Sequence, residues 1–247
     1  MNELALFAGA GGGLLASHVI GWRTVCGVEF KDSARRILVA RQNDGMLPAF
    51  PVWDDVRTFD GAPWRGIVDV VSGGFPCQAY STAASGRNTA DDLWPEMRRV
   101  VADAAPRYVF AENVSSEAID AACDDLESMG YETNAISLAA KDLGADHIRE
   151  RHWLLAYADD KSKLLCGQYA EVARSASLSH SVWEADPDEP RMADGVATRV
   201  DRYHATGNGQ VPIVAIAALW MLTANAGAEP REASASGNLL YDTRKNT

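Results

Sequence analysis

Short apolar stretches alternate with segments of helical periodicity along the first two thirds of the chain. The apolar stretches are typical of buried strands and cover residues 4–8, 24–29, 68–72, 108–112, 133–139 and 152–158. The segments with helical spacing cover residues 12–20, 32–42, 91–104 and 116–129. This alternation predicts a doubly wound α/β sheet whose right-handed crossovers make the strands parallel. Ligands of such sheets bind at the carboxyl ends of the strands, so we expect functional residues directly after strands.

The alternation stops near Asp159. Residues 159–203 are polar, include Asp186-Pro187-Asp188-Glu189-Pro190 and show no strong period, which indicates an insertion or a small subdomain. From Val211 an apolar helix follows, with Pro212 suited to its first turn, and we expect it to pack back on the sheet. The tail after Ala228 has little to bury, and we expect it to be mobile. The predicted units are therefore a catalytic and cofactor-binding domain at 1–158, a small recognition region at 159–205, a C-terminal helix at 206–227 and the tail at 228–247.

The length of 247 residues, with 47% hydrophobic and 23% charged residues, fits one large domain or a domain with a small appendage. It excludes disorder of the chain as a whole. No apolar run approaches the roughly 18 to 20 residues needed to span a bilayer, and the first residues lack the basic region of a secretory signal. We therefore expect a soluble, cytoplasmic protein with no membrane partner.

Cysteine spacing and net charge narrow the function classes. Four scattered cysteines without a CxxC pair indicate neither a zinc site nor a disulfide framework, and we expect no metal. Cys26, Cys123 and Cys166 are expected to be inert thiols that act as small hydrophobic residues. The net charge of -11 argues against bulk attraction to nucleic acid, so any such binding must use a local basic face.

A glycine-rich turn follows the first predicted strand. The segment Phe7-Ala8-Gly9-Ala10-Gly11-Gly12-Gly13 leads directly into a helix, so bare backbone and helix N–H groups can face a ligand. Leu14 occupies the place where the dinucleotide fingerprint requires glycine, which favours a smaller nucleoside cofactor. A tight strand-to-helix turn without a ligand is the alternative.

Acidic residues follow the next strand ends. Glu29 ends the second strand, where a carboxylate can accept hydrogen bonds from ribose hydroxyls, and Phe30 can stack on a base. An ordinary solvated glutamate is the alternative. Asp55 is a weaker candidate near the end of a third strand, where an adenine amino group would lie.

A thiol lies at the same edge of the predicted sheet. The strand at 68–72 is followed by Gly73-Gly74-Phe75-Pro76-Cys77-Gln78, which places Cys77 on a loop stiffened by proline. Such a thiol is a nucleophile only when nearby cations or N–H dipoles stabilise its thiolate. An inert, buried cysteine is the alternative.

The next strand ends in Glu112-Asn113-Val114. A carboxyl at the end of an apolar strand is partly desolvated, which raises its pKa and allows it to act as an acid near neutrality. Asn113 either holds Glu112 in place or serves only the turn into a helix capped by Ser115 or Ser116.

Positive charge is concentrated just before the strand at 152–158. His147, Arg149 and Arg151 are spaced by two, so they would share one face and could grip a phosphate or a base carbonyl. A solvated edge strand is the alternative. The amide-rich turn at residues 206–212 offers either cap chemistry or a site for a cofactor carboxylate.

The order of these segments resembles that of the DNA cytosine-5 methyltransferases, from Leu4 to about Ala226. The resemblance rests on the glycine turn, Glu29, Pro-Cys-Gln at 76–78, Glu-Asn-Val at 112–114, His-x-Arg-x-Arg at 147–151 and Gly-Asn-Gly-Gln-Val-Pro at 207–212. It implies a Rossmann-like class I S-adenosylmethionine-dependent methyltransferase sheet with a short target-recognition insertion.

The resemblance also implies a cofactor, S-adenosyl-L-methionine, which leaves as S-adenosyl-L-homocysteine. Glu29 would contact its ribose, Phe30 its adenine and Asn208 its other end. The implied cofactor residues are Phe7, Ala8, Gly9, Gly11, Gly13, Glu29, Phe30, Asp55, Val56, Leu93 and Asn208.

The implied chemistry is transfer of a methyl group to C5 of a cytosine flipped out of double-stranded DNA. The Cys77 thiolate would add to C6 while Glu112 donates to N3 and the exocyclic amine. Arg151 would hold the cytosine carbonyl, and Arg149 and Gln78 would position the loop at 79–92. The implied DNA contacts are Ser81 and Arg87 in this loop, beside Thr82, Ser85, Gly86 and Asn88, and Arg174, Arg191, Arg199, Arg202 and His204 in the insertion.

Three departures from the family pattern stand out: Ala79 where the family commonly has proline, His147 where many members have glutamine, and a very short recognition region. DNA would then be read by few side chains or by a second subunit. We expect a monomer or weak dimer that is associated with the nucleoid when bound to DNA, and the resemblance allows a cognate restriction endonuclease as a partner.

The rival interpretations are an RNA cytosine-5 methyltransferase on the same scaffold and a catalytically silent DNA-binding relative.

Overall fold

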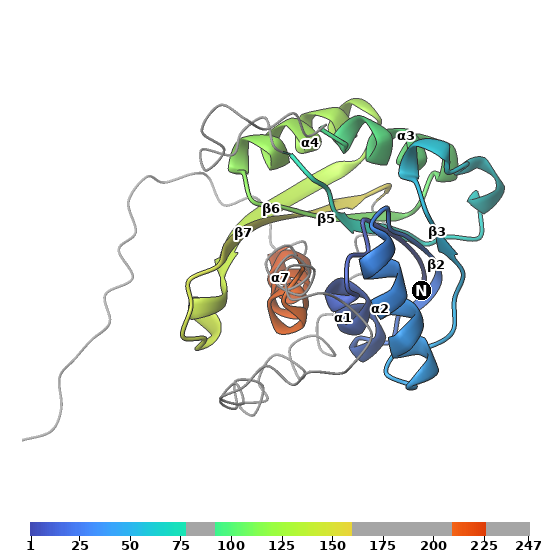
Figure 1. The fold of residues 1–247 in the computed structure, drawn as a ribbon. Coiled ribbons are helices and arrows are strands. Elements are labelled where there is room, and N and C mark those ends of the chain that lie inside the picture. The colour runs from blue at the N-terminus through green and yellow to red at the C-terminus, as the bar shows by residue number, and fades with distance from the viewer. Residues whose placement is uncertain (78–91, 160–208, 226–247) are drawn as a thin grey trace, which may run out of the picture.

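A seven-stranded mixed sheet runs through the part of the chain that the computed structural model describes, residues 1–77, 92–159 and 209–225 (Figure 1). Its strands are β1 (Asn2–Leu6), β2 (Arg23–Val28), β3 (Val52–Trp53), β4 (Val70–Gly74), β5 (Tyr108–Asn113), β6 (Glu132–Ala139) and β7 (Glu150–Tyr157), in the order β3-β2-β1-β4-β5-β7-β6. The described helices are α1 (Gly12–Val19), α2 (Asp32–Asn43), α3 (Trp94–Ala104), α4 (Ser116–Ser128) and α7 (Pro212–Asn225), with short 3-10 turns at Val56–Thr58, Ala62–Trp64 and Ala140–Leu143. The predicted doubly wound α/β fold is confirmed.

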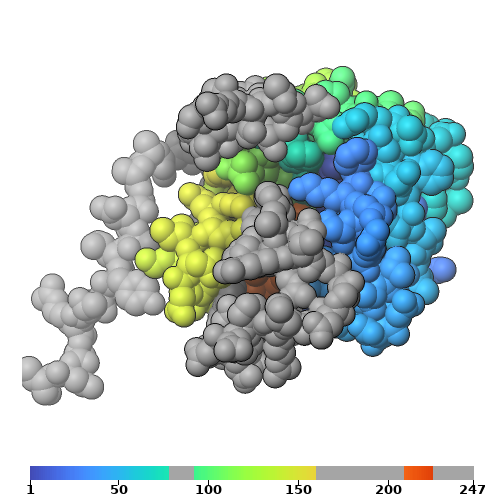
Figure 2. Space-filling model, viewed as in Figure 1, coloured from blue at the N-terminus to red at the C-terminus, as the bar shows by residue number. Residues whose placement is uncertain are grey.

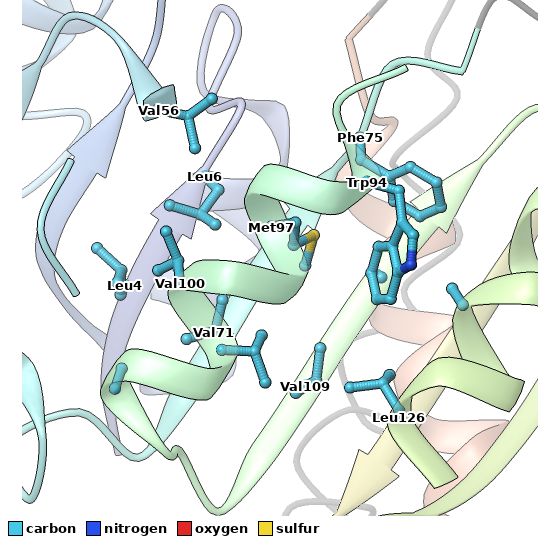
Figure 3. Close-up of a cluster of buried hydrophobic side chains, with 14 of the residues drawn as sticks. Leu4, Leu6, Val56, Val71, Phe75, Trp94, Met97, Val100, Val109 and Leu126 are labelled. Carbon is cyan, nitrogen blue, oxygen red and sulfur yellow. The ribbon is translucent and has the colours of Figure 1, made fainter. Parts of the chain in front are cut away.

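Helices cover both faces of the sheet because the central strands are apolar on both sides. In β5, Val109 and Ala111 face the core beneath α3 and α4, whereas Tyr108 and Phe110 face the core beneath α7. Figure 3 shows the first of these cores, with the side chains of α3 lying over the strands. The continuous apolar runs in the sequence therefore reflect burial on two faces.

The helix α7 is apolar on nearly all sides and is buried accordingly. Residues 213–219 are all buried, and the helix packs against α1, β6 and β7. It thus brings a segment from the far end of the sequence against the first helix (Figure 1).

The expectation that all strands run parallel is wrong for β7. This strand lies between β5 and β6 and is antiparallel to both. The reason is local: only the 3-10 turn Ala140–Leu143 and a short loop join β6 to β7, so no crossover helix returns the chain to the other end of the sheet. In the space-filling view the β6–β7 pair, in yellow, and the start of the chain, in blue, lie on opposite sides of the molecule (Figure 2).

The predicted recognition region at 159–205, apart from Asp159, and the whole predicted tail at 228–247 lie outside the described residues. Among the described residues, no helix has the length and hydropathy needed to cross a membrane.

A buried carboxylate ties the first half of the sheet to α1. Glu3 of β1 is 1% exposed. Its carboxyl accepts hydrogen bonds from Ser17 of α1 (2.6 Å), Ser72 of β4 (2.6 Å) and Thr24 of β2 (2.8 Å). Burial raises the pKa of Glu3, and the three hydroxyl donors oppose that rise.

Replacing Glu3 by alanine should lower the free energy of unfolding by about 3 kcal/mol, because three buried hydroxyls lose their acceptor. Since the folded pKa lies above the unfolded one, the carboxyl's contribution is complete below the unfolded pKa and decreases as pH rises through the folded pKa. The loss in Glu3→Ala should therefore be larger at pH 5 than at pH 8 in urea titrations. The exposed Asp120→Ala serves as a control and should change stability by less than about 0.5 kcal/mol. Equal losses in the two variants would contradict this prediction.

Candidate active site

Five chain segments meet at one edge of the sheet. The parallel strands β1, β2, β4 and β5 all end there. Because β7 is antiparallel to β5, its first residues lie at the same edge, opposite Glu112 and Asn113. The glycine turn, Glu29, Cys77, Glu112 and Arg151 are thereby brought to one side of the sheet.

The glycine turn is fixed by backbone hydrogen bonds before any ligand is considered. Ala8 N–H donates to the Val28 carbonyl (3.0 Å), and Gly9 N–H donates to Glu29 Oε2 (2.7 Å). Phe7 has a φ of 53°, a conformation that costs a non-glycine residue energy and is held by the surrounding bonds. Gly11 starts α1 with a φ of 89°, which favours glycine.

Glu29 is buried rather than solvated. Its Oε1 accepts from Lys31 N–H (2.8 Å) while Oε2 accepts from Gly9 N–H. Each carboxylate oxygen has a second lone pair, so the side chain can still accept from two further hydroxyl groups. The alternative of an ordinary solvated glutamate is thereby contradicted.

Next to Glu29, aromatic surface is exposed. Phe30 is 63% exposed, and the Arg57 guanidinium lies over its ring at 5.5 Å from the centroid. Asp55 Oδ1 accepts from Arg57 N–H (3.0 Å) and caps the 3-10 turn that begins at Val56. The Val56 side chain is buried in the core, and its carbonyl accepts from Arg99 (2.7 Å).

The loop that carries Cys77 is tied to its neighbours on both sides. Asn113 Nδ2 donates to the Phe75 carbonyl (2.8 Å), and Leu93 N–H donates to the Pro76 carbonyl (3.2 Å). Cys77 itself is 5% exposed and belongs to the hydrophobic core beneath α3. A thiol in this position has to be uncovered before it can meet a substrate.

Asn113 serves the turn into α4, as one of its two predicted roles requires, and its other hydrogen bond goes to the loop before Cys77 instead of to Glu112. Its Oδ1 accepts from Ser115 N–H (3.0 Å), and Ser115, not Ser116, caps α4 by accepting from Ala118 N–H. Its amide nitrogen holds the loop before Cys77, through Phe75. Asn113 therefore links the candidate nucleophile to β5.

Glu112 is 7% exposed and forms an ion pair, with Oε1 2.9 Å from Arg151 Nε. Burial raises its pKa, while Arg151, a side-chain hydrogen bond with Gln210, and Arg149 oppose the rise. The net shift is upward, which favours a protonated carboxyl. Glu112 pairs with Gly74 of β4, three residues before Cys77, so the acid and the thiol come from adjacent strand ends.

The three basic residues predicted to share one face of a strand do not do so, because only Arg151 lies within β7. Arg149 lies outside β7, with a φ of 37°, and its guanidinium donates to the Gly209 carbonyl, whereas Arg151 pairs with Glu112. His147 is exposed in the preceding loop. The alternative of an edge strand is also wrong, because β6 lies outside β7.

The sequence interpretation did not single out two residues that support this edge. Arg41 of α2 donates to the Ala10 carbonyl of the glycine turn (2.6 Å), and no local sequence signal marks it. Gln210 reaches Glu112 from the segment before α7. The sequence marks Gln210 only as part of the amide-rich turn at 206–212, and it does not indicate that Glu112 is the partner of this side chain.

The remaining candidates, Gln78, Ser81, Arg87, Arg174, Arg191, Arg199, Arg202, His204 and Asn208, lie outside the described residues. Within the described ranges, no three His, Cys, Asp or Glu residues are grouped as a metal site would require. Cys26 and Cys123 are free thiols there, and burial raises the pKa of Cys26 to about 11, as expected of an inert thiol.

Comparison with known proteins shows which protein family the chain matches. The model of the C-5 cytosine-specific DNA methylase family matches residues 1–203. Type II methyltransferase M.Eco47II of Escherichia coli is 37% identical over 118 residues, covering 45% of this chain and 26% of the relative. Type II methyltransferase M.DsaV of Dactylococcopsis salina is 24% identical over 224 residues, covering 85% of this chain and 62% of the relative. The chain thus spans between a quarter and about three fifths of these relatives.

Among solved structures, that of S. pombe Dnmt2 methyltransferase is similar with a TM-score of 0.51 and 19% sequence identity. It covers 64% of this chain and 50% of the other. This likeness shows a shared methyltransferase fold.

Removing Arg151 should strongly destabilise the fold, because it leaves the Glu112 carboxylate buried without its cation. We expect Arg151→Ala to lower the free energy of unfolding by about 3 to 5 kcal/mol at neutral pH. Its loss raises the pKa of Glu112 further, and stability then falls more steeply as pH rises, so the loss should be smaller at pH 5 than at pH 8. Urea titrations measure both values. Arg36→Ala breaks an ion pair whose side chains are 70% and 60% exposed and should cost less than about 0.5 kcal/mol. A loss independent of pH would show that the ion pair is not the cause.

Proposed function

The chain belongs to the C-5 cytosine-specific DNA methylase family, and from this premise we propose that it transfers a methyl group from S-adenosyl-L-methionine to C5 of a cytosine in duplex DNA. The observation that carries the proposal is the pairing of Gly74 with Glu112, which brings the Cys77 loop and a buried acid to adjacent strand ends. The type II relatives support it. Because C6 is inaccessible inside stacked DNA, the target base has to be flipped out.

The residues at the edge fit the cofactor. Glu29 retains lone pairs for the ribose hydroxyls, Phe30 offers an exposed ring for adenine, and the turn from Phe7 to Gly13 brings bare backbone beside them. Asp55 and Val56 lie next along the edge, and Leu93 lies at the start of α3. Once bound, the cofactor supplies an electrophilic methyl group. We assign Asn208 to its other end by the family pattern.

Cys77 is the proposed nucleophile. Its thiolate forms a bond to C6, the electron pair of the C5–C6 double bond shifts to form a C4–C5 double bond, and the electron pair of the C4–N3 double bond moves to N3. Glu112 donates a proton at N3, which removes the charge that attack would otherwise build there. C5 then takes the methyl group as the bond from the methyl carbon to the cofactor sulfur breaks, and N3 returns its proton to Glu112. Transfer of the C5 proton to a water molecule and expulsion of the thiolate from C6 restore the C5–C6 double bond. Because Cys77 is buried, we propose that its loop moves when DNA binds.

The environment of Glu112 suits an acid. Burial raises the pKa of Glu112, so this carboxyl takes up the proton that it has to donate more readily than an ordinary glutamate does, and Arg151 fixes the position of Oε1. Arg151 is also our candidate for the contact to the cytosine carbonyl. Arg149 supports this part of the edge through Gly209, and we retain Gln78 as its partner in positioning the loop after Cys77.

We propose that residues 1–158 and 206–227 form the catalytic unit and that residues 159–205 read the DNA. The basic residues Arg174, Arg191, Arg199 and Arg202, with Ser81 and Arg87 of the loop, are the proposed DNA contacts. Since the relatives are named type II methyltransferases, a cognate restriction endonuclease is the partner class we propose, at the nucleoid.

The direct test is transfer of label from methyl-labelled S-adenosylmethionine to duplex DNA. We expect label at C5 of cytosine with the unmodified protein. In Cys77→Ser the label should be lost while DNA binding, measured by gel shift, is retained, because only the covalent step is removed. Transfer RNA is assayed in parallel. Label confined to RNA would show an RNA methyltransferase, and DNA binding without label would show a silent binder; either result contradicts the proposal.

Glu112→Gln should reduce the rate of methyl transfer by about 10² to 10⁴ fold, because the amide cannot donate the proton that N3 requires. Single-turnover kinetics with DNA measure the chemical step. Glu117→Gln, on the exposed first turn of α4, is the matched control and should transfer at the normal rate. A normal rate in Glu112→Gln would assign the acid role to another residue.

A further inference from the structure

The carboxamide of Gln210 lies between Glu112 and the start of α1. A Cβ atom placed on Gly74 would be 2.6 Å from Glu112 Oε2 and 3.3 Å from Gln210 Nε2, so these two atoms flank the same point of β4. A Cβ atom on Gly13 would be 2.1 Å from Gln210 Oε1. The side-chain amide of Gln210 therefore has its nitrogen near Glu112 and its oxygen against Gly13 of the glycine turn.

The backbone of Gln210 is held as closely as its side chain. A Cβ atom on Gly12 would be 2.0 Å from the Gln210 carbonyl oxygen. Arg149 donates to the carbonyl of Gly209, and the buried helix α7 begins two residues after Gln210, at Pro212. The residue is thus fixed from α1, from the start of β7 and from α7.

Arg151 and Gln210 hold the Glu112 carboxyl together. Arg151 Nε lies 2.9 Å from Glu112 Oε1, and the Gln210 side chain is hydrogen-bonded to the same carboxyl. A carboxyl with two such partners cannot rotate freely about its last bond. This kind of restraint matters for a group that has to deliver a proton to one ring atom.

We propose that Gln210 is a positioning residue for Glu112, and that Gly12 and Gly13 are glycines because Gln210 occupies the space of their missing side chains. The effect on methyl transfer rests on the function proposed above, whereas the effect on the Glu112 carboxyl does not. Gln210 thereby accounts for the missing side chains at these two positions of the glycine turn.

The test is the titration of the Glu112 carboxyl by NMR in full-length protein labelled with ¹³C at the glutamate side-chain carboxyl. Its signal is assigned by its disappearance in Glu112→Gln. Among the described residues, the charged groups facing this carboxyl are Arg151 and Arg149, and both are kept. In Gln210→Met, which has similar length and no hydrogen-bonding amide, the midpoint should move to higher pH, since burial remains and one interaction that favours the carboxylate is gone. Gln42→Met, a glutamine replaced on α2, should leave the midpoint unchanged.

A second variant approaches the same contact from the glycine turn. Gly13→Ala brings a methyl group against Gln210 Oε1 and should displace the side chain, moving the Glu112 midpoint in the same direction as Gln210→Met. The combined variant should show no further shift, because both changes remove one contact. The measurement on Gly13→Ala still tests the proposal if the Gln210→Met protein does not fold. An unchanged Glu112 midpoint in every folded variant overturns the proposal.

Kinetics separate this inference from the proposed function. We expect Gln210→Met to lower kcat for methyl transfer about tenfold with little change in KM for S-adenosylmethionine, and to move the alkaline decline of kcat to higher pH. A shifted NMR midpoint in a protein that transfers no methyl group would support the positioning of Glu112 and refute the proposed function. A normal transfer rate with an unshifted midpoint would do the reverse.

Discussion

The burial of one carboxyl group, that of Glu112, constrains the arrangement of the whole site. A carboxyl at the end of a central strand is costly to keep away from water unless cations and hydrogen bonds compensate it. The fold supplies Arg151 from β7 and Gln210 from the segment before α7, and their combined effect leaves the pKa of Glu112 raised. A carboxyl that is protonated more readily than an ordinary glutamate and is held in one orientation suits the addition to a pyrimidine that we propose.

The direction of β7 makes this compensation feasible. In a fully parallel sheet the first residues of this strand would lie at the other end of the strands, far from Glu112. Because β7 runs antiparallel between β5 and β6, Arg151 starts beside the end of β5 and reaches the carboxyl. The short connection from β6 to β7 is therefore a functional feature as well as a topological one. It also places Arg149 where it can hold the backbone before Gln210.

The glycine turn serves two neighbours. Its first part, through Gly9, joins Glu29 and offers backbone to a nucleoside, whereas Gly12 and Gly13 make room for Gln210. Likewise Asn113 caps the turn into α4 and holds the loop before Cys77. The proposed cofactor residues, acid and nucleophile are thus connected by hydrogen bonds between strand ends, so a change at one of them is expected to disturb the others.

The sequence by itself determined the elements and the edge: apolar runs and helical periods located β1, β2, β4, β5 and the helices between them, and the residues after each strand located Glu29, Cys77 and Glu112 at one side. Only the tertiary structure decided the antiparallel direction of β7 and the partners of Arg149, Arg151 and Gln210. The physical reason is the separation along the chain of the residues that interact. Periodicity records which face of an element is buried, whereas strand direction and side-chain pairing depend on contacts between residues that are far apart in the chain.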